Sequence, residues 1–299
     1  MKKLIFILIL MIPIILSAQQ DVILTKYSFN GMFFNPAIAG STGEEQGSAF
    51  LNYRDQWMGL DGSPQTFLAG TEFNLFRNRV GLGLTLGRES IGVDSRTEVM
   101  TNYSYRVRVS DGYLAIGIRA GFNFYRSNLN DIKHTDRGDR IYDQGDINQT
   151  MFSVGSGLYY HQKNFFVGFS VPAISVVNGN GLQKTRHYYV HTGASFALSE
   201  YSDIKLDPEI LLKYVSGAPL QFTLGTRLWL IKDLNIGMHY RSSDAFALST
   251  EFIISDQLTI GASYDFPTML LKETHNGTIE LLVGYKFNYA GYYIPMSRR

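Results

Sequence analysis

The sequence predicts an all-β protein, a transmembrane antiparallel β-barrel of the outer-membrane type with about 14 strands and both termini in the periplasm. Three observations carry this prediction: an export signal with no later helical span, segments that alternate with a period of two, and links that alternate between short and long. The composition agrees, because aromatic residues make up 14% of the chain and charged residues only 18%. Soluble domains usually contain roughly 25% charged residues.

Residues 1–18 are predicted to be a signal peptide. Lys2 and Lys3 form a positive start, residues 4–16 are an apolar run too short to span a bilayer comfortably, and Ser17-Ala18 offers a small-residue cleavage site. The chain contains no cysteine, which excludes a lipid-anchored cysteine and a disulfide framework. After Ala18 no apolar run approaches ~18 residues, so a helical span is not expected.

The charge balance gives no reason to expect nucleic acid as a partner. The whole chain has a net charge of +1, with 27 basic and 26 acidic residues. Its length of 299 residues would accommodate two soluble domains or one β-barrel, so length alone does not decide the domain count.

Fourteen segments of about 8 to 15 residues are expected to be strands. They cover residues 48–57, 66–76, 80–89, 93–109, 112–126, 151–161, 164–171, 187–198, 203–215, 220–231, 234–241, 245–254, 257–266 and 278–288.

Within these segments, one face is apolar and the other is small or polar. In residues 112–126, for example, Ile116 and Ile118 share one face while Gly117 and Arg119 share the other. This alternation suits a wall with lipid outside and a wet lumen inside. A soluble β-sandwich has the same period, so alternation alone leaves both folds open.

The links between segments favour the membrane barrel. Every second link is very short, at residues 77–79, 110–111, 162–163, 199–202, 232–233 and 255–256. The intervening links are usually longer, notably 127–150, 172–186 and 267–277. An even number of strands with short periplasmic turns and long outer loops is the outer-membrane pattern. Aromatic residues cluster near segment ends, as an interfacial girdle requires, although the strand propensity of aromatic residues would also explain them.

The predicted lumen is too wide for wall side chains to fill it. Fourteen strands fall between the eight whose interior fills and the sixteen to eighteen that leave an aqueous channel. The inward face carries charges of both signs, for which mutual pairing across the lumen is the preferred interpretation over a charge-selective filter. These residues are Arg54, Glu72, Arg96, Glu98, Arg106, Arg108, Arg119, Lys205, Glu209, Lys213, Arg227, Glu251 and Glu280.

No group of residues predicts catalysis, a metal or a cofactor. On one straight strand, the Cα atoms of His187 and His191 would lie roughly 13 Å apart, too far to ligate one metal. Residues 81–87 have glycines but lack the Gly-Lys-Ser or Gly-Lys-Thr of a phosphate loop, and residues 155–157 lack the nucleophile-elbow spacing. An acidic loop without EF-hand spacing is expected to be solvated. It contains Asp131, His134, Asp136, Asp139, Asp143 and Asp146. The chain is therefore not expected to be an enzyme.

The stretch from residue 27 to residue 67 carries a specific pattern of aromatic, Asn, Gly and Pro residues. It contains Tyr27, Phe29, Asn30, Asn35, Pro36, Ala37, Ala39, Gly40 and Ser41, followed by Tyr53, Arg54, Gln56, Trp57, Gly59, Gly62, Pro64 and Thr66. On these residues the chain resembles the PorP/SprF family of outer-membrane proteins of the type IX secretion system of Bacteroidota. Two positions depart from the family pattern: Gly31 stands where proline is common, and Ile38 where an aromatic residue is frequent.

The resemblance implies a role in protein export. Such a barrel would lie in the outer membrane, in contact with its lipid, and engage secreted or surface-displayed proteins that carry C-terminal sorting domains, including gliding adhesins. Other envelope components of the same secretion system would be further partners. A general diffusion channel for small solutes is the alternative function. A third, an enzyme at the rim, would need convergent Asp, His or Ser groups, which the pattern does not bring together.

Four parts of the chain follow from these predictions. Residues 1–18 are the signal peptide, 19–47 an N-terminal leader, 48–288 the transmembrane barrel and 289–299 a C-terminal tail. The turn at Asn35-Pro36 and the neighbouring aromatic residues suggest that the leader packs into the lower lumen as a plug.

Overall fold

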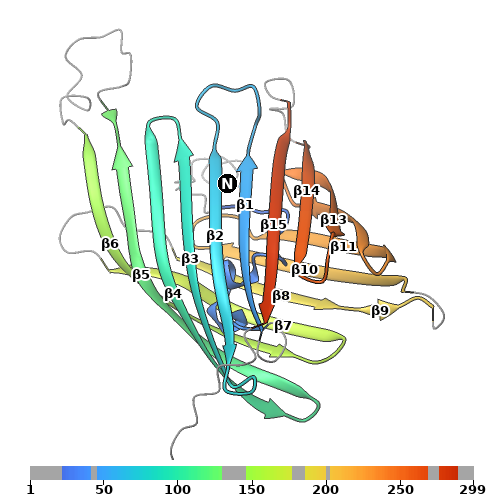
Figure 1. Ribbon diagram of the computed structural model, residues 1–299. Coiled ribbons are helices and arrows are strands. Elements are labelled where there is room, and N and C mark those ends of the chain that lie inside the picture. Colours follow the sequence, from blue (N-terminus) through green and yellow to red (C-terminus); the bar gives the residue numbers. More distant parts are fainter. Residues whose placement is uncertain are drawn as a thin grey trace, which may run out of the picture.

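The computed structural model describes residues 22–41, 46–129, 146–176, 186–199, 203–268 and 276–288. These residues form a closed antiparallel β-barrel, with two short helices near the start of the chain (Figure 1). None of the helices in this part of the chain is long and apolar enough to cross a bilayer.

The barrel is a simple meander in which, with one exception, each strand pairs with its neighbours in sequence. The helical elements are α2 (Gly31–Phe34) and the 3₁₀-helix η1 (Pro36–Ile38). The strands are β1 (Gln46–Asp55), β2 (Gln65–Leu75), β3 (Val80–Ile91), β4 (Asp94–Val109), β5 (Gly112–Ser127), β6 (Ile147–His161), β7 (Phe165–Val176), β8 (His187–Ala194), β9 (Phe196–Ala197), β10 (Lys205–Val215), β11 (Gln221–Ile231), β12 (Leu234–Arg241), β13 (Ala245–Ile253), β14 (Leu258–Pro267) and β15 (Thr278–Asn288). The exception is that β8 pairs with β10 and the short β9 pairs with β10 alone.

The first and last strands close the barrel. Strand β1 pairs with β15 over its whole length, which places Arg54 directly opposite Glu280. We call this β1–β15 pairing the seam. It leaves no free sheet edge there, as hydrocarbon requires. The predicted fold, a closed 14-strand barrel, is confirmed, because each expected segment forms a strand and only the eighth is divided, into β8 and the short β9.

Strand β7 extends further than the sequence predicts. The strand was expected to end at residue 171, yet Pro172 lies within Phe165–Val176. The β6–β7 register shifts between Val154 and Ser156 at this point, and the pairing of β7 with β8 ends at Ser170. Proline is compatible with such an irregularity because no ladder bond to β8 needs its missing N–H. The link predicted to begin at residue 172 therefore begins later.

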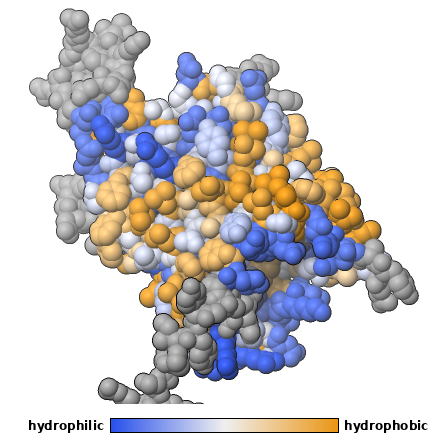
Figure 2. Space-filling model, in the orientation of Figure 1, coloured by the Kyte–Doolittle hydropathy of each residue, from blue (hydrophilic) through white to orange (hydrophobic). Residues whose placement is uncertain are grey.

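The outer wall is apolar, as the alternation predicts. Ile116 and Ile118 are 56% and 58% exposed, whereas Arg119 on the other face is 3% exposed. Figure 2 shows apolar side chains gathered across the middle of the visible face, with hydrophilic residues toward both ends. This band is suited to hydrocarbon, and the polar ends to the two interfaces.

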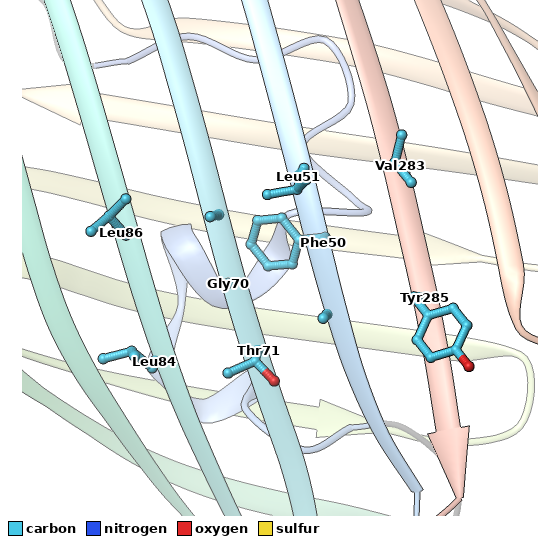
Figure 3. Close-up of a pocket in the computed structure, with 10 residues that line it drawn as sticks. Phe50, Leu51, Gly70, Thr71, Leu84, Leu86, Val283 and Tyr285 are labelled. Atoms are coloured by element: carbon cyan, nitrogen blue, oxygen red, sulfur yellow. The ribbon is translucent and has the colours of Figure 1, made fainter.

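A shallow depression of 440 Å³ interrupts this wall over β1, β2, β3 and β15. Leu51, Leu84, Leu86 and Val283 line it, and the backbone at Gly70 forms part of its floor (Figure 3). These four side chains are 37% to 50% exposed, on the outward face of their strands. The depression therefore faces lipid, and its apolar lining suits an acyl chain.

We expect Ile118→Arg to lower the free energy of unfolding by about 2–4 kcal/mol, the cost of arginine near the bilayer midplane. Ile118 lies in the middle of the outward row from Leu114 to Phe124 on β5. Urea titrations of the protein refolded into lipid vesicles would measure the change. The matched control is Ile91→Arg at the end of β3, where the same side chain should cost about 0–1 kcal/mol. Equal losses at both positions would contradict this assignment of depth.

Candidate functional site

The lumen contains the chain's own N-terminal segment. Figure 1 shows the helices of the leader inside the ring of strands; residues 22–41 are the part of it that the structure describes ahead of β1. A cluster of buried apolar side chains joins the leader to inward residues of the wall. The leader supplies Leu24, Tyr27, Met32, Phe33, Phe34 and Ala39, and the wall supplies Phe50, Leu68, Tyr189 and Leu211. Inward apolar residues of the wall thus pack against the leader.

The leader runs along the barrel axis. Its C-terminal end lies near the short turns, where the Gly40 amide donates to Glu72 Oε2 at 2.6 Å. Its first described residue, Val22, lies beside Lys213, Gln221 and Arg241, next to the links on the opposite rim. The leader therefore spans most of the distance between the two rims.

Lumenal glutamates bind main-chain amides of the leader. Glu280 accepts the Thr25 amide at 2.8 Å with one carboxylate oxygen and the Lys26 amide at 3.0 Å with the other. Glu72 accepts the Gly40 amide in the same way. Hydrogen bonds to ionised acceptors are roughly twice as strong as neutral ones.

Donors on the wall bind main-chain carbonyls of the leader. The Arg119 guanidinium donates to the Phe33 carbonyl at 2.7 Å, and the Ser170 hydroxyl donates to the Phe34 carbonyl at 2.8 Å. The Ala39 carbonyl accepts from both Ser104 and Arg106. These contacts satisfy backbone groups that would otherwise be buried without partners.

The lumenal charges pair with one another as well as with the leader. Arg119 pairs with Glu98 at 3.0 Å, and Lys26 of the leader pairs with Glu251 at 3.1 Å. Inward charges therefore do pair, but Glu98 and Arg119 lie on the adjacent strands β4 and β5 rather than on opposite sides of the lumen, as the prediction had it. Since buried charges are costly without partners, this pairing is what allows so many of them to lie in the lumen.

Arg54, at the seam, contacts two buried carboxylates. Its guanidinium lies 2.7 Å from Asp265 on β14 and 3.1 Å from Glu280 on β15. Arg241 also reaches Asp265, at 3.3 Å, and the Thr25 hydroxyl donates to Asp265 at 2.7 Å. This network, which we call the seam network, joins the first strand, the last two strands and the leader.

Glycines of the wall leave space for the leader backbone. A Cβ at Gly117 would overlap the main chain of Pro36 and Ala37, and one at Gly81 would overlap the Ala39 carbonyl. A Cβ at Gly157 would overlap the Asn35 side chain. These three glycines therefore allow the leader to approach the wall closely.

The residues that carry the family resemblance lie in two places. One group is in the leader, and the other is in and around the β1–β2 loop, on the rim that carries the long loops. Those of the leader are buried in the lumen except Phe29, which is half-buried, and Ser41, which is exposed. In the loop, Gly59 and Gly62 have φ of +90° and +74°, a left-handed conformation that favours glycine. Hydrogen bonds fix this loop to both neighbours: Met58 donates to the Gly277 carbonyl and Gly92 donates to the Gly62 carbonyl, each at 2.9 Å.

The remaining pattern residues surround this loop. Arg54, Pro64 and Thr66 are buried, Gln56 and Trp57 are half-buried, and Tyr53 faces outward. The two departures from the family pattern contact each other, because a Cβ at Gly31 would lie 3.0 Å from Ile38 Cδ1.

Within the described part of the chain, the candidate metal ligands form no common site. His191 lies in the lumen, with its ring centroid 5.2 Å from that of Tyr27, whereas His187 stacks on Tyr189. Among the described residues, no three His, Cys, Asp or Glu side chains are grouped to hold a metal. Asp146 is described, and the other candidates of the acidic loop lie outside the described residues.

Comparisons with known proteins agree with the fold. A family model described as "Type IX secretion system membrane protein PorP/SprF" matches residues 16–285. No curated protein gives a match. Among solved structures, a mutant of the TodX monoaromatic hydrocarbon channel is 10% identical, with a TM-score of 0.51 and 85% of this chain and 93% of that chain covered.

Two further solved structures are similar in outline. The CymD monoaromatic hydrocarbon channel is 11% identical over 87% of this chain and 92% of its own, with a TM-score of 0.49. A FadL homologue of Pseudomonas aeruginosa is 11% identical over 86% and 94%, with a TM-score of 0.48. At such identities the likeness concerns the fold alone.

Proposed function

The chain belongs to the PorP/SprF family of type IX secretion system membrane proteins, and from this premise we propose that it engages secreted or surface-displayed proteins for export or attachment. It is an outer-membrane barrel, and neither its family nor its fold is a class of enzymes. The partners that we propose are proteins with C-terminal sorting domains, gliding-type adhesins among them, together with other envelope components of the system.

The observation that most favours this proposal over solute diffusion is the occupied lumen. The leader fills the interior with buried side chains from Leu24 to Ala39, so we propose that residues 19–47 act as a plug. A general diffusion channel needs a continuous aqueous path, which a plugged barrel of this size does not offer. The plug thus supports contact with a protein rather than passage of small solutes.

The long-loop rim is the surface where we place the first contact with such a partner. Its β1–β2 loop is held by main-chain hydrogen bonds to Gly277 on one side and Gly92 on the other. A loop fixed on both sides presents a defined shape, and recognition residues commonly lie on loops that a rigid scaffold positions. We propose that both termini are periplasmic, which would put this rim at the cell surface.

Deletion of this gene should lower the surface display of proteins with C-terminal sorting domains, measured by protease accessibility on intact cells. Complementation with the wild-type gene, or with Arg79→Ala at an exposed site on the opposite rim, should restore display. Normal display of all such proteins in the deletion strain would refute the proposal. Large openings of the purified wild-type protein in planar bilayers would instead support the diffusion channel.

A further inference from the structure

The wall of the lumen recognises the leader largely through its main chain. Side chains of five different strands bind three amides and three carbonyls of the leader. The amides are those of Thr25, Lys26 and Gly40, and the carbonyls are those of Phe33, Phe34 and Ala39. Every polypeptide carries such groups, so this part of the recognition does not depend on the leader's own side chains.

The shape of the lumen points the same way. Gly81 and Gly117 both lie against the main chain of the leader. A larger residue at either position would overlap that main chain. Their positions on β3 and β5 form a surface that a polypeptide main chain can approach closely. A small solute would not require wall side chains that bind successive amide and carbonyl groups of a polypeptide main chain.

The charge of this surface selects among polypeptides. Four glutamates contact the leader: Glu72, Glu209, Glu251 and Glu280. The Lys26 ammonium of the leader donates to Glu251 and to the Thr250 carbonyl. Four arginines of the wall also contact the leader: Arg54, Arg106, Arg119 and Arg241. An occupant with main-chain amides and a lysine therefore complements the glutamates, while its main-chain carbonyls complement the arginines.

The leader is bound in the lumen without forming a strand of the sheet. Its described residues form only α2 and η1 and pair with none of the strands, and residues 42–45 connect it to β1. Replacing the leader by another segment would therefore change only contacts with the wall side chains. The hydrogen bonds between the strands of the barrel would remain intact.

We infer that the lumen is a binding site for a polypeptide segment, that the leader is its tethered occupant, and that an unfolded, lysine-containing segment of an exported protein takes its place. This inference rests on the proposed function and specifies its partner chemistry. The displaced leader would leave the axial path open to the incoming segment.

A cleavable linker tests the site in the intact protein. A specific protease sequence is inserted within residues 42–45, the barrel is purified and cut, and a fluorescent synthetic peptide of residues 22–41 is added. We expect the cut leader to exchange with the peptide. A peptide with esters in place of the Thr25 and Lys26 amides should bind at least about 10-fold more weakly, because both donors to Glu280 are lost.

Matched peptides separate the outcomes. An ester at Ser28, whose amide no wall side chain is seen to bind in the described structure, should leave affinity within about 3-fold, a change smaller than one such hydrogen bond contributes. An unrelated unfolded 20-residue peptide containing lysine should compete for the site, and the same peptide with glutamate in place of that lysine should compete more weakly, because it lacks the partner of Glu251. A cut leader that never exchanges, equal binding of ester and amide, or failure of the lysine peptide to compete would each overturn the inference. Display in the deletion strain is a separate readout, so failure of the proposed function is recognised independently.

Discussion

Replacing Arg54 by alanine is expected to lower the free energy of unfolding by about 3–5 kcal/mol, the loss typical when one partner of a buried ion pair is removed. Asp265 and Glu280 are 2% and 0% exposed, and the Arg54 guanidinium lies within 3.1 Å of both. Without it, Arg241 and the leader would be left to compensate two buried carboxylates. The effect should be large because the same side chain stabilises both the seam and the leader.

Urea titrations in lipid vesicles would measure this loss. Arg79→Ala, at an exposed position near a short turn, provides the matched control and should change stability little. The double variant Arg54→Met/Glu280→Gln should be less damaging than Arg54→Ala with Glu280 intact, because it removes an uncompensated charge together with its partner. A single Arg54→Ala variant as stable as the control would disprove the role of the seam network.

Gly117→Ala is expected to undock the leader while the barrel stays closed. The new Cβ would overlap the main chain of Pro36 and Ala37, and the overlap cannot be relieved by turning a side chain. Overpacking of this kind typically costs 1–3 kcal/mol, which corresponds to about a 5- to 150-fold shift against the docked leader. We therefore expect single-channel openings in planar bilayers that the wild-type protein lacks.

Two measurements tie those openings to the leader. Limited proteolysis should cut within residues 22–41 in the variant but not in the wild type. Gly261→Ala is the control, since its added Cβ meets only Glu251, Leu282 and Thr250 of the wall, none closer than 3.2 Å. If Gly117→Ala remained closed and resistant to protease, the close approach at Gly117 would not be what holds the leader.

The barrel could be predicted from local sequence patterns because the direction in which each side chain faces, and the pairing of successive strands, depend on residues close together in the sequence. A period of two identifies the lipid-facing side of each strand, and the alternation of short and long links gives the meander. The extension of β7 through Pro172 could not be foreseen, because the register shift opposite Gly155 that accommodates proline depends on the neighbouring strand. The break after Ala194 likewise leaves no sign in the hydrophobic pattern, which continues through Phe196.

The interior of the barrel was less accessible to such reasoning. Strand parity placed Glu72, Arg119 and Glu280 in the lumen, but it could not show that their partners are main-chain groups of the leader, which have no sequence signature. Ser104 and Ser170 bind leader carbonyls and look like any other small lumenal residue. The turn composition of residues 27–41 was the useful signal, since a segment with no core of its own needs an outside surface to pack against.

The seam network also bears on how the barrel is assembled. Glu280 belongs to the last strand, and it binds Thr25, Lys26, Asn52 and Arg54, all from the first part of the chain. The ends of the sequence must therefore meet before any of these charges is neutralised, a long-range step that is intrinsically slow. A leader already positioned beside β1 would present its amides to the arriving β15 and so act as a template for closure. A barrel that closed without its leader would have no plug in its lumen. Assembly of the barrel in the membrane and its readiness for export would then depend on the same segment.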